Sequence, residues 1–565
     1  MTNKQIAKSL QEVADLLELT GGNSFRVRAF ANAARLLQRL PEQVQDLLSE
    51  GRLTEVQGIG SSLAKDIATL VETGALPQRK ELADKLPQGL PEVLKIKGLG
   101  VKKVRALWQG LGITSLEELA VAARENRLLD AEGFGKKTQE QILASIALQE
   151  VYRSQRRYAT VYRLLMPLLE TLEKHTGTVQ CMPVGEFRRK MPTVSEVTVL
   201  LKATHEAHVL TALSALEIKT EAVGTNTWKA LLPDGFEVTF IWAESERFGT
   251  EVFLKTGPTS FIEAFMRKSG ALPLVSDEAL LFEQAGMTFV DPELRDLAPA
   301  ERSEVELRGH KLLEVSDLKG TLHNHSTYSD GAHTLYEMAE AAREMGLAYY
   351  GSCDHSQSLT IAHGMSIERV QAQQAEIAQH NAAYAQMGVN FRIYSGIESD
   401  ILNDGALDYP KEILASFDLV VASIHNGFNM TEEAATQRLI TAIENPFTTI
   451  LGHPTGRLLL AREGYPVNHH KIIDACAANG VAIELNANPY RLDMDWKWIP
   501  YALEKGVWIS INPDAHAKEG LQDVFWGVEV ARKAGLTPEN CLNALPRIAF
   551  EQWLKQKKTN LHLPA

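Results

Sequence analysis

Residues that commonly bind metal ions are concentrated in the C-terminal part of the sequence. Eleven of the 16 histidines lie between residues 323 and 516. Two pairs, His323/His325 and Asp514/His516, have one residue between them, so both side chains of each pair would lie on one face of a strand. The candidate metal ligands are His323, His325, Asp330, His355, Glu398, His425, His453, Asp514 and His516.

This set of residue types indicates a particular chemistry. Imidazole and carboxylate ligands without thiolate suit zinc, manganese or iron, and the mixture does not choose among them. Several divalent ions that share a carboxylate generate hydroxide near neutral pH and stabilise the oxygens of an in-line phosphoryl displacement. The candidate ligands therefore predict hydrolysis of a phosphate ester.

Seven apolar, β-rich runs would position these residues, because most of the runs end in one of them. The runs are KGTLHNHS, AYYGSCDH, FRIYSGIE, LVVASIH, TTILGHP, VAIELN and VWISINPDAH. Helical patterns such as TLYEMAEAAREMG separate most of them. Repeated strand–helix units predict a parallel α/β barrel, and the candidate ligands would converge at its C-terminal mouth.

Each candidate also has a plainer interpretation. A single histidine at a strand end is more often structural than a ligand, but here the placement repeats from strand to strand. Asp330 lies in STYSDG after the first run, where a turn-forming aspartate is the alternative. Five further histidines are out of phase with the strand ends and are expected at the surface: His333, His363, His380, His469 and His470.

A second type of candidate site lies in the first 150 residues. Three segments contain a Gly–apolar–Gly triplet followed by a helical pattern, and the glycines are Gly58, Gly60, Gly98, Gly100, Gly133 and Gly135. Such glycines permit a tight turn and leave backbone N–H groups bare at a helix N-terminus, where a phosphate oxygen can bind. One copy could be a plain helix–helix turn. Three copies, two followed by the lysine pairs Lys102-Lys103 and Lys136-Lys137, resemble helix–hairpin–helix motifs, which bind the DNA backbone without reading sequence.

Composition restricts the class of protein. No apolar run approaches the roughly 20 residues that span a bilayer, so no membrane partner is expected. Four widely spaced cysteines, Cys181, Cys353, Cys476 and Cys541, predict reduced thiols in the cytoplasm. The net charge of −13 disfavours general binding to polyanions, so any contact with nucleic acid must be local. We expect a monomer.

At 565 residues the chain is too long for one core, and four segments are expected. Residues 1–82 form a helical DNA-binding domain, and residues 83–150 contain the further glycine turns. Residues 151–312 alternate β-like and helical runs, which predicts an α+β domain, and the charged stretch 298–317 is expected to be a linker. Residues 313–565 form the barrel.

The segments that carry the candidate ligands resemble the PHP (polymerase and histidinol phosphatase) superfamily. The whole chain resembles bacterial family X DNA polymerases of the PolX type. The most specific segments are TLHNHSTYSDG, GSCDHS, SGIESDIL, SIHNGF, AIENPFTTILGHPTGRLLLAREGY, ELNANPYRLD and PDAH. The resemblance implies a distorted (β/α)7 barrel, up to three divalent metals (Mn²⁺, Zn²⁺ or Fe²⁺) and 3′–5′ exonuclease activity.

The same resemblance divides the candidate ligands into three metal sites. The first would contain His323, His325, Glu398 and Asp514. The second would share Glu398 with His425 and His453, and the third would contain Asp330, His355 and His516. Arg457 in HPTGR and Arg491 in NPYRL are candidate phosphate clamps, and for each a structural salt bridge is an equal alternative.

The middle segment departs from the resemblance. Polymerases of this type carry a Gly-Ser pair, a D-x-D motif and a third Asp, whose carboxylates hold two magnesium ions. Here Gly185 is kept, Glu186 replaces the serine, and Glu196, Thr198 and Thr239 occupy the three Asp positions. One carboxylate cannot hold two magnesium ions. We therefore expect a nucleotidyltransferase-like core without polymerase activity, kept as a scaffold or DNA clamp.

A DNA-processing hydrolase is the leading hypothesis. It would remove nucleotides from 3′ ends in DNA repair, because one chain combines phosphate-binding turns with a phosphoesterase site. Three alternatives remain: an active DNA polymerase with exonuclease activity, a small-molecule phosphatase, and a DNA-binding adaptor without catalysis. The missing carboxylates, the three glycine turns and the complete ligand set respectively argue against them.

Overall fold

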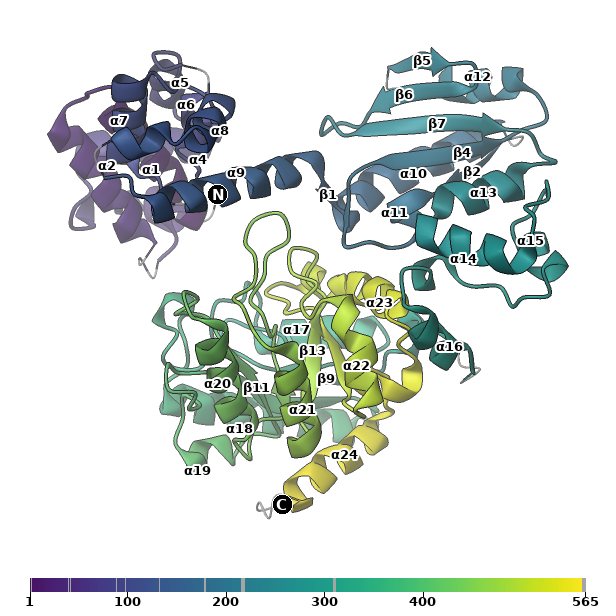
Figure 1. The fold of residues 1–565 in the computed structure, drawn as a ribbon. Coiled ribbons are helices and arrows are strands. Elements are labelled where there is room, and N and C mark those ends of the chain that lie inside the picture. Colours follow the sequence, from purple (N-terminus) through teal and green to yellow (C-terminus); the bar gives the residue numbers. More distant parts are fainter. Residues whose placement is uncertain are drawn as a thin grey trace. The chain divides into compact units, whose positions relative to one another are not determined.

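The computed structural model describes residues 1–560 except 2, 39, 41, 88, 97, 132, 177–178, 215–218 and 308–310. The chain divides into two compact units, Met1–Arg153 and Ser154–Ala565 (Figure 1). Among the described residues, no helix has both the length and the hydrophobicity needed to cross a bilayer. The three fold types expected from the sequence, all-α, α+β and α/β barrel, are confirmed.

The first unit is helical. Its α-helices are α1 (Asn3–Leu19), α2 (Ser24–Leu37), α3 (Val44–Ser49), α4 (Ser61–Thr73), α5 (Pro77–Ala83), α6 (Leu90–Val93), α7 (Val101–Leu111), α8 (Leu116–Arg124) and α9 (Lys136–Ser154). Leucines spaced for one helix face, such as Leu63 and Leu70 of α4, are buried in a common core. Polar N-caps begin some helices, and the Ser115 side chain accepts a hydrogen bond from the Glu118 backbone N–H.

The second unit begins with an α+β region. The short strands β1 (Arg156–Arg157) and β3 (Thr193–Val194) pair antiparallel. A five-stranded sheet has the order β2 (Gln180–Pro183), β4 (Val197–Lys202), β7 (Glu237–Ala243), β6 (Thr227–Leu231) and β5 (Thr220–Gly224). Only the central β4–β7 pair is parallel. The accompanying helices are α10 (Tyr158–Thr176), α11 (Gly185–Arg188), α12 (Glu206–Ser214), α13 (Phe248–Thr256), α14 (Thr259–Ser269) and α15 (Ala279–Gln284).

The expected linker at 298–317 is wrong for much of its length, because helix α16 (Pro299–Leu307) lies within it. The Glu301 carboxylate accepts a hydrogen bond from the Ala298 backbone N–H at 2.8 Å, which caps the helix start. Val305 approaches Gly535, where an added Cβ would lie 2.5 Å from its side chain. The Arg302 guanidinium also lies 5.1 Å from the centroid of the Phe261 ring. The composition of the stretch does not reveal these contacts.

A seven-stranded parallel sheet forms the C-terminal barrel. Its strands follow chain order: β8 (Gly320–Thr321), β9 (Tyr349–Ser352), β10 (Arg392–Asp400), β11 (Leu419–Ser423), β12 (Ile450–Leu451), β13 (Ala482–Asn486) and β14 (Ile509–Asn512). Six of the seven predicted runs contain one of these strands, and β10 extends two residues beyond its run, FRIYSGIE. The sheet is nearly closed, because Asn324 and Ala515 form a parallel bridge just beyond β8 and β14.

Helices cover the outside of the barrel (Figure 1). They are α17 (Leu335–Glu344), α18 (Ile367–Gln386), α19 (Lys411–Leu414), α20 (Glu432–Ile443), α21 (His469–Asn479), α22 (Ile499–Glu504), α23 (Val524–Lys533) and α24 (Arg547–Asn560). All residues of β9 and β11 are buried, as expected for strands covered on both faces. The strand ends therefore share one rim of the barrel.

A half-buried ion pair and a pair with a fully buried lysine connect the α+β region with α23 of the barrel. The Lys190 Nζ lies 2.9 Å from a Glu529 carboxylate oxygen. Lys533 is completely buried, pairs with Asp296 and donates to the Arg189 carbonyl at 3.1 Å. Burial lowers the pKa of Lys533 to about 8, although Asp296 favours its charged form. Each part of the second unit therefore supplies charges that neutralise buried charges of the other.

Candidate metal centre and phosphate-binding turns

The barrel brings the nine candidate ligands together near the C-terminal ends of its strands, eight of them in the three groups given next and His453 with its Nε2 2.9 Å from Glu398 Oε1. Three groups of side chains have ligand atoms within 4.8 Å of one another. They are His325, Asp330, His355 and His516; then His323, His325 and Asp514; and finally His355, Glu398 and His425. None of the five histidines expected at the surface belongs to these groups, as far as the described residues extend.

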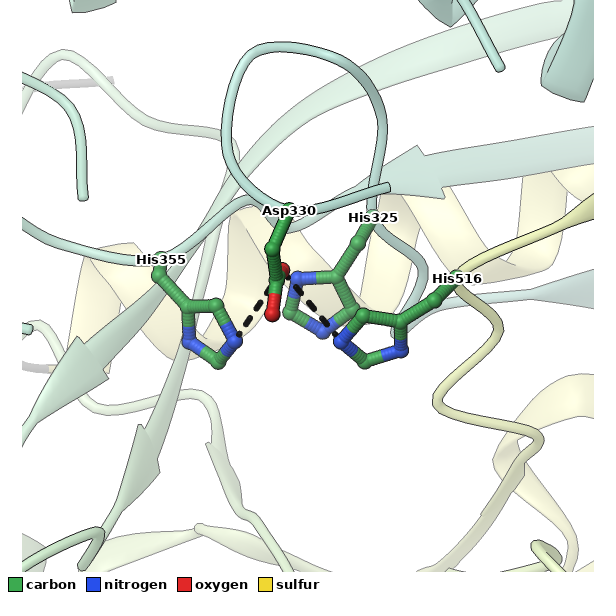
Figure 2. A group of neighbouring side chains, drawn as sticks. All are labelled: His325, Asp330, His355 and His516. Atoms are coloured by element: carbon green, nitrogen blue, oxygen red, sulfur yellow. Dashed lines mark ion pairs between the residues drawn. The ribbon is translucent and has the colours of Figure 1, made fainter. Parts of the chain in front are cut away.

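Figure 2 shows the first group, in which Asp330 reaches the three imidazoles from the loop after β8. Asp330 Oδ1 lies 3.3 Å from His516 Nε2 and 3.6 Å from His355 Nε2. The His325 and His516 rings stack with centroids 4.1 Å apart. Burial opposes ionisation of Asp330, but the His516 hydrogen bond and the other imidazoles hold its pKa below the usual value. Asp330 therefore faces the cluster and does not act only as a turn residue.

Glu398 lies at the centre of the cluster, fully buried in β10. Its Oε1 is 2.9 Å from His453 Nε2, 3.1 Å from His425 Nε2 and 3.4 Å from His323 Nε2. Its Oε2 faces His355 Nδ1 at 2.8 Å and His325 Nε2 at 3.6 Å. Burial raises the pKa of this carboxyl, yet His425, His323 and His355 together hold it well below the usual value. One carboxylate thus contacts imidazoles from both sides.

Asp514, which follows β14, completes the second group with His323 and His325. Its Oδ1 lies 3.0 Å from His325 Nε2 and 3.7 Å from His323 Nε2. Its backbone has a φ of 53°, a left-handed conformation that aspartate tolerates better than most residues. Such strained positions are found preferentially at functional sites.

The donor atoms of this cluster fit divalent metal ions. His323 Nε2 and His325 Nδ1 are buried and have no hydrogen-bond partner among the described atoms. A buried polar atom without a partner is costly, at about 1–3 kcal/mol. Metal coordination satisfies such nitrogens, and the surrounding carboxylates would neutralise the ions.

Two buried carboxylates behind the cluster are absent from the sequence-based set. Glu484 Oε2 lies 2.7 Å from His323 Nδ1, and Asp400 Oδ1 lies 3.0 Å from His425 Nδ1. Carboxylates in this position fix the tautomer and orientation of a metal-binding imidazole. The available signal was the acidic residue inside a buried strand, in ELN and in IESD.

The two arginines proposed as phosphate clamps differ in their surroundings. Arg457 Nη1 lies 2.6 Å from the Asp495 carboxylate, and its Nε donates to the Arg491 carbonyl at 3.0 Å. Arg457 is therefore engaged in holding a loop. Arg491 Nε lies 3.7 Å from Asp514 Oδ2, beside the cluster.

The α+β region places the substituted polymerase positions side by side. Thr198 of β4 and Thr239 of β7 are partners in the parallel register. Glu186 accepts hydrogen bonds from the Ser195 backbone N–H at 2.7 Å and from the Ser195 hydroxyl at 2.8 Å. Among the described residues between 154 and 307, no three histidine, cysteine or acidic side chains form a potential metal group.

The three glycine turns of the first unit have the predicted geometry. The first glycines, Gly58, Gly98 and Gly133, have φ values of 104°, 90° and 84°. The second glycines, Gly60, Gly100 and Gly135, directly precede α4, α7 and α9, and an added Cβ there would meet open space.

The apolar residue between the glycines is buried at each turn, and the glycines themselves are exposed. None of these three helices carries an acidic residue in its first turn. Lys102, Lys136 and Lys137 are exposed near these helix starts, whereas Lys103 donates to the Gly98 carbonyl at 3.2 Å. The turns therefore present bare N–H groups and positive charge, which suits phosphate oxygens.

Comparison with known proteins gives matches in every part of the chain. Residues 1–76 match a helix-hairpin-helix domain, residues 90–147 a SAM-like helix-hairpin-helix tandem, and residues 321–488 the PHP domain. A "probable phosphatase" of Thermoanaerobacter sp. (strain X514) is 28% identical over 252 residues, which cover 42% of this chain and 95% of that protein. A "probable phosphatase" of Syntrophotalea carbinolica is 27% identical over 39% of this chain and 90% of that protein.

A relative from Bacillus subtilis (strain 168) matches the chain along its length. It is named "DNA polymerase/3'-5' exonuclease PolX" and is 34% identical, with 98% of this chain and 100% of the relative covered. The helix-hairpin-helix matches fall in the helical region described above, and the PHP match begins at the first strand of the barrel. The chain therefore belongs to the PolX family of DNA polymerases that carry a C-terminal PHP domain.

Proposed function

We propose that the chain is a divalent-metal-dependent phosphodiesterase that removes nucleotides from DNA 3′ ends during repair. The single observation that carries this proposal is the group of nine histidine and acidic side chains around Glu398 at the barrel mouth. Two further facts support it: the phosphate-binding turns of the first unit and the exonuclease named in the relative's description.

The side chains divide between up to three metals. His323, His325, Glu398 and Asp514 would hold the first, and Glu398, His425 and His453 the second. Asp330, His355 and His516 would hold the third. We keep Mn²⁺, Zn²⁺ and Fe²⁺ open as the ions. When bound, these ions supply a hydroxide near neutral pH and neutralise charge on the reacting phosphate.

The protein's own groups would orient this chemistry. Glu484 and Asp400 hold His323 and His425 through their Nδ1 atoms, so each ring directs Nε2 into the cluster. The Arg491 guanidinium lies beside Asp514 and would attract the phosphate of the scissile bond. Arg457 would act indirectly, because it fixes the loop that carries Arg491.

We also propose that the α+β region has lost polymerase activity. Of the three positions that hold magnesium in such polymerases, only Glu196 is acidic, and Thr198 and Thr239 lie adjacent without carboxylates. Magnesium is therefore not expected there. The region would act as a scaffold or DNA clamp.

The partner would be DNA, bound through its backbone without sequence preference. The segments 1–82 and 83–150 would grip the duplex with Gly58, Gly60, Gly98, Gly100, Lys102, Lys103, Gly133, Gly135, Lys136 and Lys137. Segment 151–312 would be the polymerase-like core, and segment 313–565 the nuclease. We expect a monomer in the cytoplasm, where its four free cysteines would stay reduced.

A small-molecule phosphatase is the second candidate, and one observation favours it. The "probable phosphatase" relatives align along 90–95% of their own lengths but with only 39–42% of this chain. The helix-hairpin-helix regions would have no role with a small substrate, which favours DNA.

Incubation of the pure protein with a labelled 3′-recessed duplex and Mn²⁺, with and without dNTPs, tests these alternatives. Progressive shortening supports the exonuclease, and extension in the presence of dNTPs would show an active polymerase. Release of phosphate from small monoesters without any change in the DNA would favour the phosphatase.

A further inference from the structure

An exposed aromatic ring is adjacent in sequence to Arg491, whose guanidinium lies beside the metal cluster. Tyr490 precedes Arg491 in the loop after β13, and 54% of its surface is exposed. Its backbone is nevertheless fixed: the Leu459 N–H donates to the Tyr490 carbonyl at 2.6 Å, and the Tyr490 N–H donates to the Asn488 side chain at 3.0 Å. A large apolar ring is therefore held in solvent on an ordered loop.

The α+β region supplies a cation to this ring. The Arg157 guanidinium lies 3.9 Å from the centroid of the Tyr490 ring. Pairing of β1 with β3 fixes the backbone of Arg157, opposite Thr193. Among the described residues, Arg157 forms no ion pair with a carboxylate, whereas its neighbour Arg156 pairs with Asp234 at 3.1 Å. The charge of Arg157 is thus available to an anion.

Arg491, which follows Tyr490 in the sequence, supplies a second cation. Arg491 Nε is 3.7 Å from Asp514 Oδ2, and no hydrogen bond from its side chain is found in the described structure. Tyr490 thus contacts an arginine of the α+β region and directly precedes in sequence the arginine at the metal cluster. An aromatic face combined with nearby cations is the usual way to bind single-stranded nucleic acid without reading its sequence.

We propose that Tyr490, Arg157 and Arg491 form a nucleotide subsite of the nuclease. The Tyr490 ring would stack on the base at the 3′ end, and the two guanidinium groups would bind the adjacent phosphates. This inference rests on the proposed exonuclease function. It gives the α+β region a direct part in that function, because its Arg157 completes the subsite.

The alternative is that Tyr490 and Arg157 only hold the two regions together. Chemistry distinguishes the two roles. A structural contact would affect all substrates equally, whereas a stacking platform acts only on a substrate that has a terminal base. The substrate, and not only the protein, must therefore be varied.

The experiment compares two 3′-recessed duplexes with full-length protein and Mn²⁺. One ends in a normal nucleotide and the other in an abasic residue. For each variant, kcat/KM on DNA is divided by kcat/KM on bis(p-nitrophenyl) phosphate. We expect Tyr490→Ala to lower this ratio about tenfold on the normal end and to leave the abasic end unaffected. Tyr490→Phe should restore the ratio, because it keeps the ring.

Arg157→Ala should weaken DNA binding and reduce the slope of log K against log salt by about 0.7, the value for one contact to single-stranded DNA. Arg163→Ala is the matched control. Arg163 also contacts a barrel aromatic, with its guanidinium 5.2 Å from the Trp526 ring, but it already pairs with Asp523 at 3.4 Å. Its replacement should leave the slope unchanged.

The possible failures are distinguishable. If Tyr490→Ala loses equal activity on the normal and the abasic ends, the ring is structural and the subsite is refuted. The same follows if Arg157→Ala and Arg163→Ala have equal salt slopes. If the unaltered protein hydrolyses the small diester but leaves both duplexes intact, the proposed exonuclease function fails, and the subsite with it.

Discussion

Replacing Glu484 with glutamine should weaken metal binding although no candidate ligand is itself replaced. The Glu484 carboxylate is completely buried and accepts from four donors. On one oxygen these are His323 Nδ1 at 2.7 Å and Asn512 Nδ2 at 3.1 Å; on the other they are the His453 N–H at 3.1 Å and Asn486 Nδ2 at 3.0 Å. Glutamine has only one acceptor oxygen, so its amide group would face two other donors.

The expected magnitude follows from these contacts. A hydrogen bond to a charged group contributes about 1.5–3 kcal/mol, roughly twice a neutral one. Loss of a carboxylate that orients a metal-binding histidine typically weakens metal affinity about 10–100-fold, which corresponds to about 1.4–2.7 kcal/mol. We therefore expect Glu484→Gln to raise the metal Kd about 10–100-fold through misorientation of His323.

Metal content would be measured by elemental analysis after dialysis against a series of metal buffers. Glu340→Gln is the matched control, because Glu340 also bonds neighbours, Arg343 and Tyr384, but lies on the outer helix α17. Circular dichroism of the metal-free proteins would show whether both variants fold. If folded Glu484→Gln retains the metal affinity of the control, the orienting role of this carboxylate is refuted.

Three other outcomes are expected. Glu398→Gln should lose metal from two sites and nearly all nuclease activity, whereas Asp330→Asn should lose metal from one site. Elemental analysis and nuclease rates of both variants check this. Full metal content in Glu398→Gln would contradict the proposal that two metals share this carboxylate. Primer extension by the full-length protein should be absent because Thr198 and Thr239 cannot hold magnesium; template-dependent extension would refute this. A fragment of residues 154–565 should hydrolyse small diesters but have a higher KM for DNA than the full chain, and its DNA affinity should depend less on salt concentration. Equal DNA cleavage by the fragment and the full chain would show that the glycine turns are only structural.

The sequence predicted most of the barrel because each strand is a short apolar run with a polar residue at its end. This pattern also identified His323, Glu398 and Asp514, which the fold brings into one cluster. It could not identify Glu484 inside β13 or Asp400 at the end of β10, because the spacing of an acidic residue in a strand does not distinguish a hydrogen-bond acceptor from a ligand. Their role depends on which imidazole nitrogen lies opposite, and only the three-dimensional structure establishes that.

The same limitation applies outside the barrel. The stretch that contains α16 was expected to be a linker, because its charged residues do not reveal the contacts of Val305 with Gly535 and of Arg302 with Phe261. Arg457 and Arg491 were indistinguishable in the sequence. In the structure Arg457 forms an ion pair with Asp495, whereas Arg491 lies beside Asp514 in the metal cluster.

The buried lysine of the second unit has a consequence for how this chain can evolve. Lys533 finds its carboxylate partner, Asp296, across the boundary between the α+β region and the barrel. Deletion of the α+β region would leave Lys533 without this partner, and breaking a buried pair costs about 3–5 kcal/mol. That is a large part of the roughly 5–15 kcal/mol that stabilises a typical domain. The α+β region therefore helps to stabilise the barrel through this buried charge, apart from any catalytic role of its own.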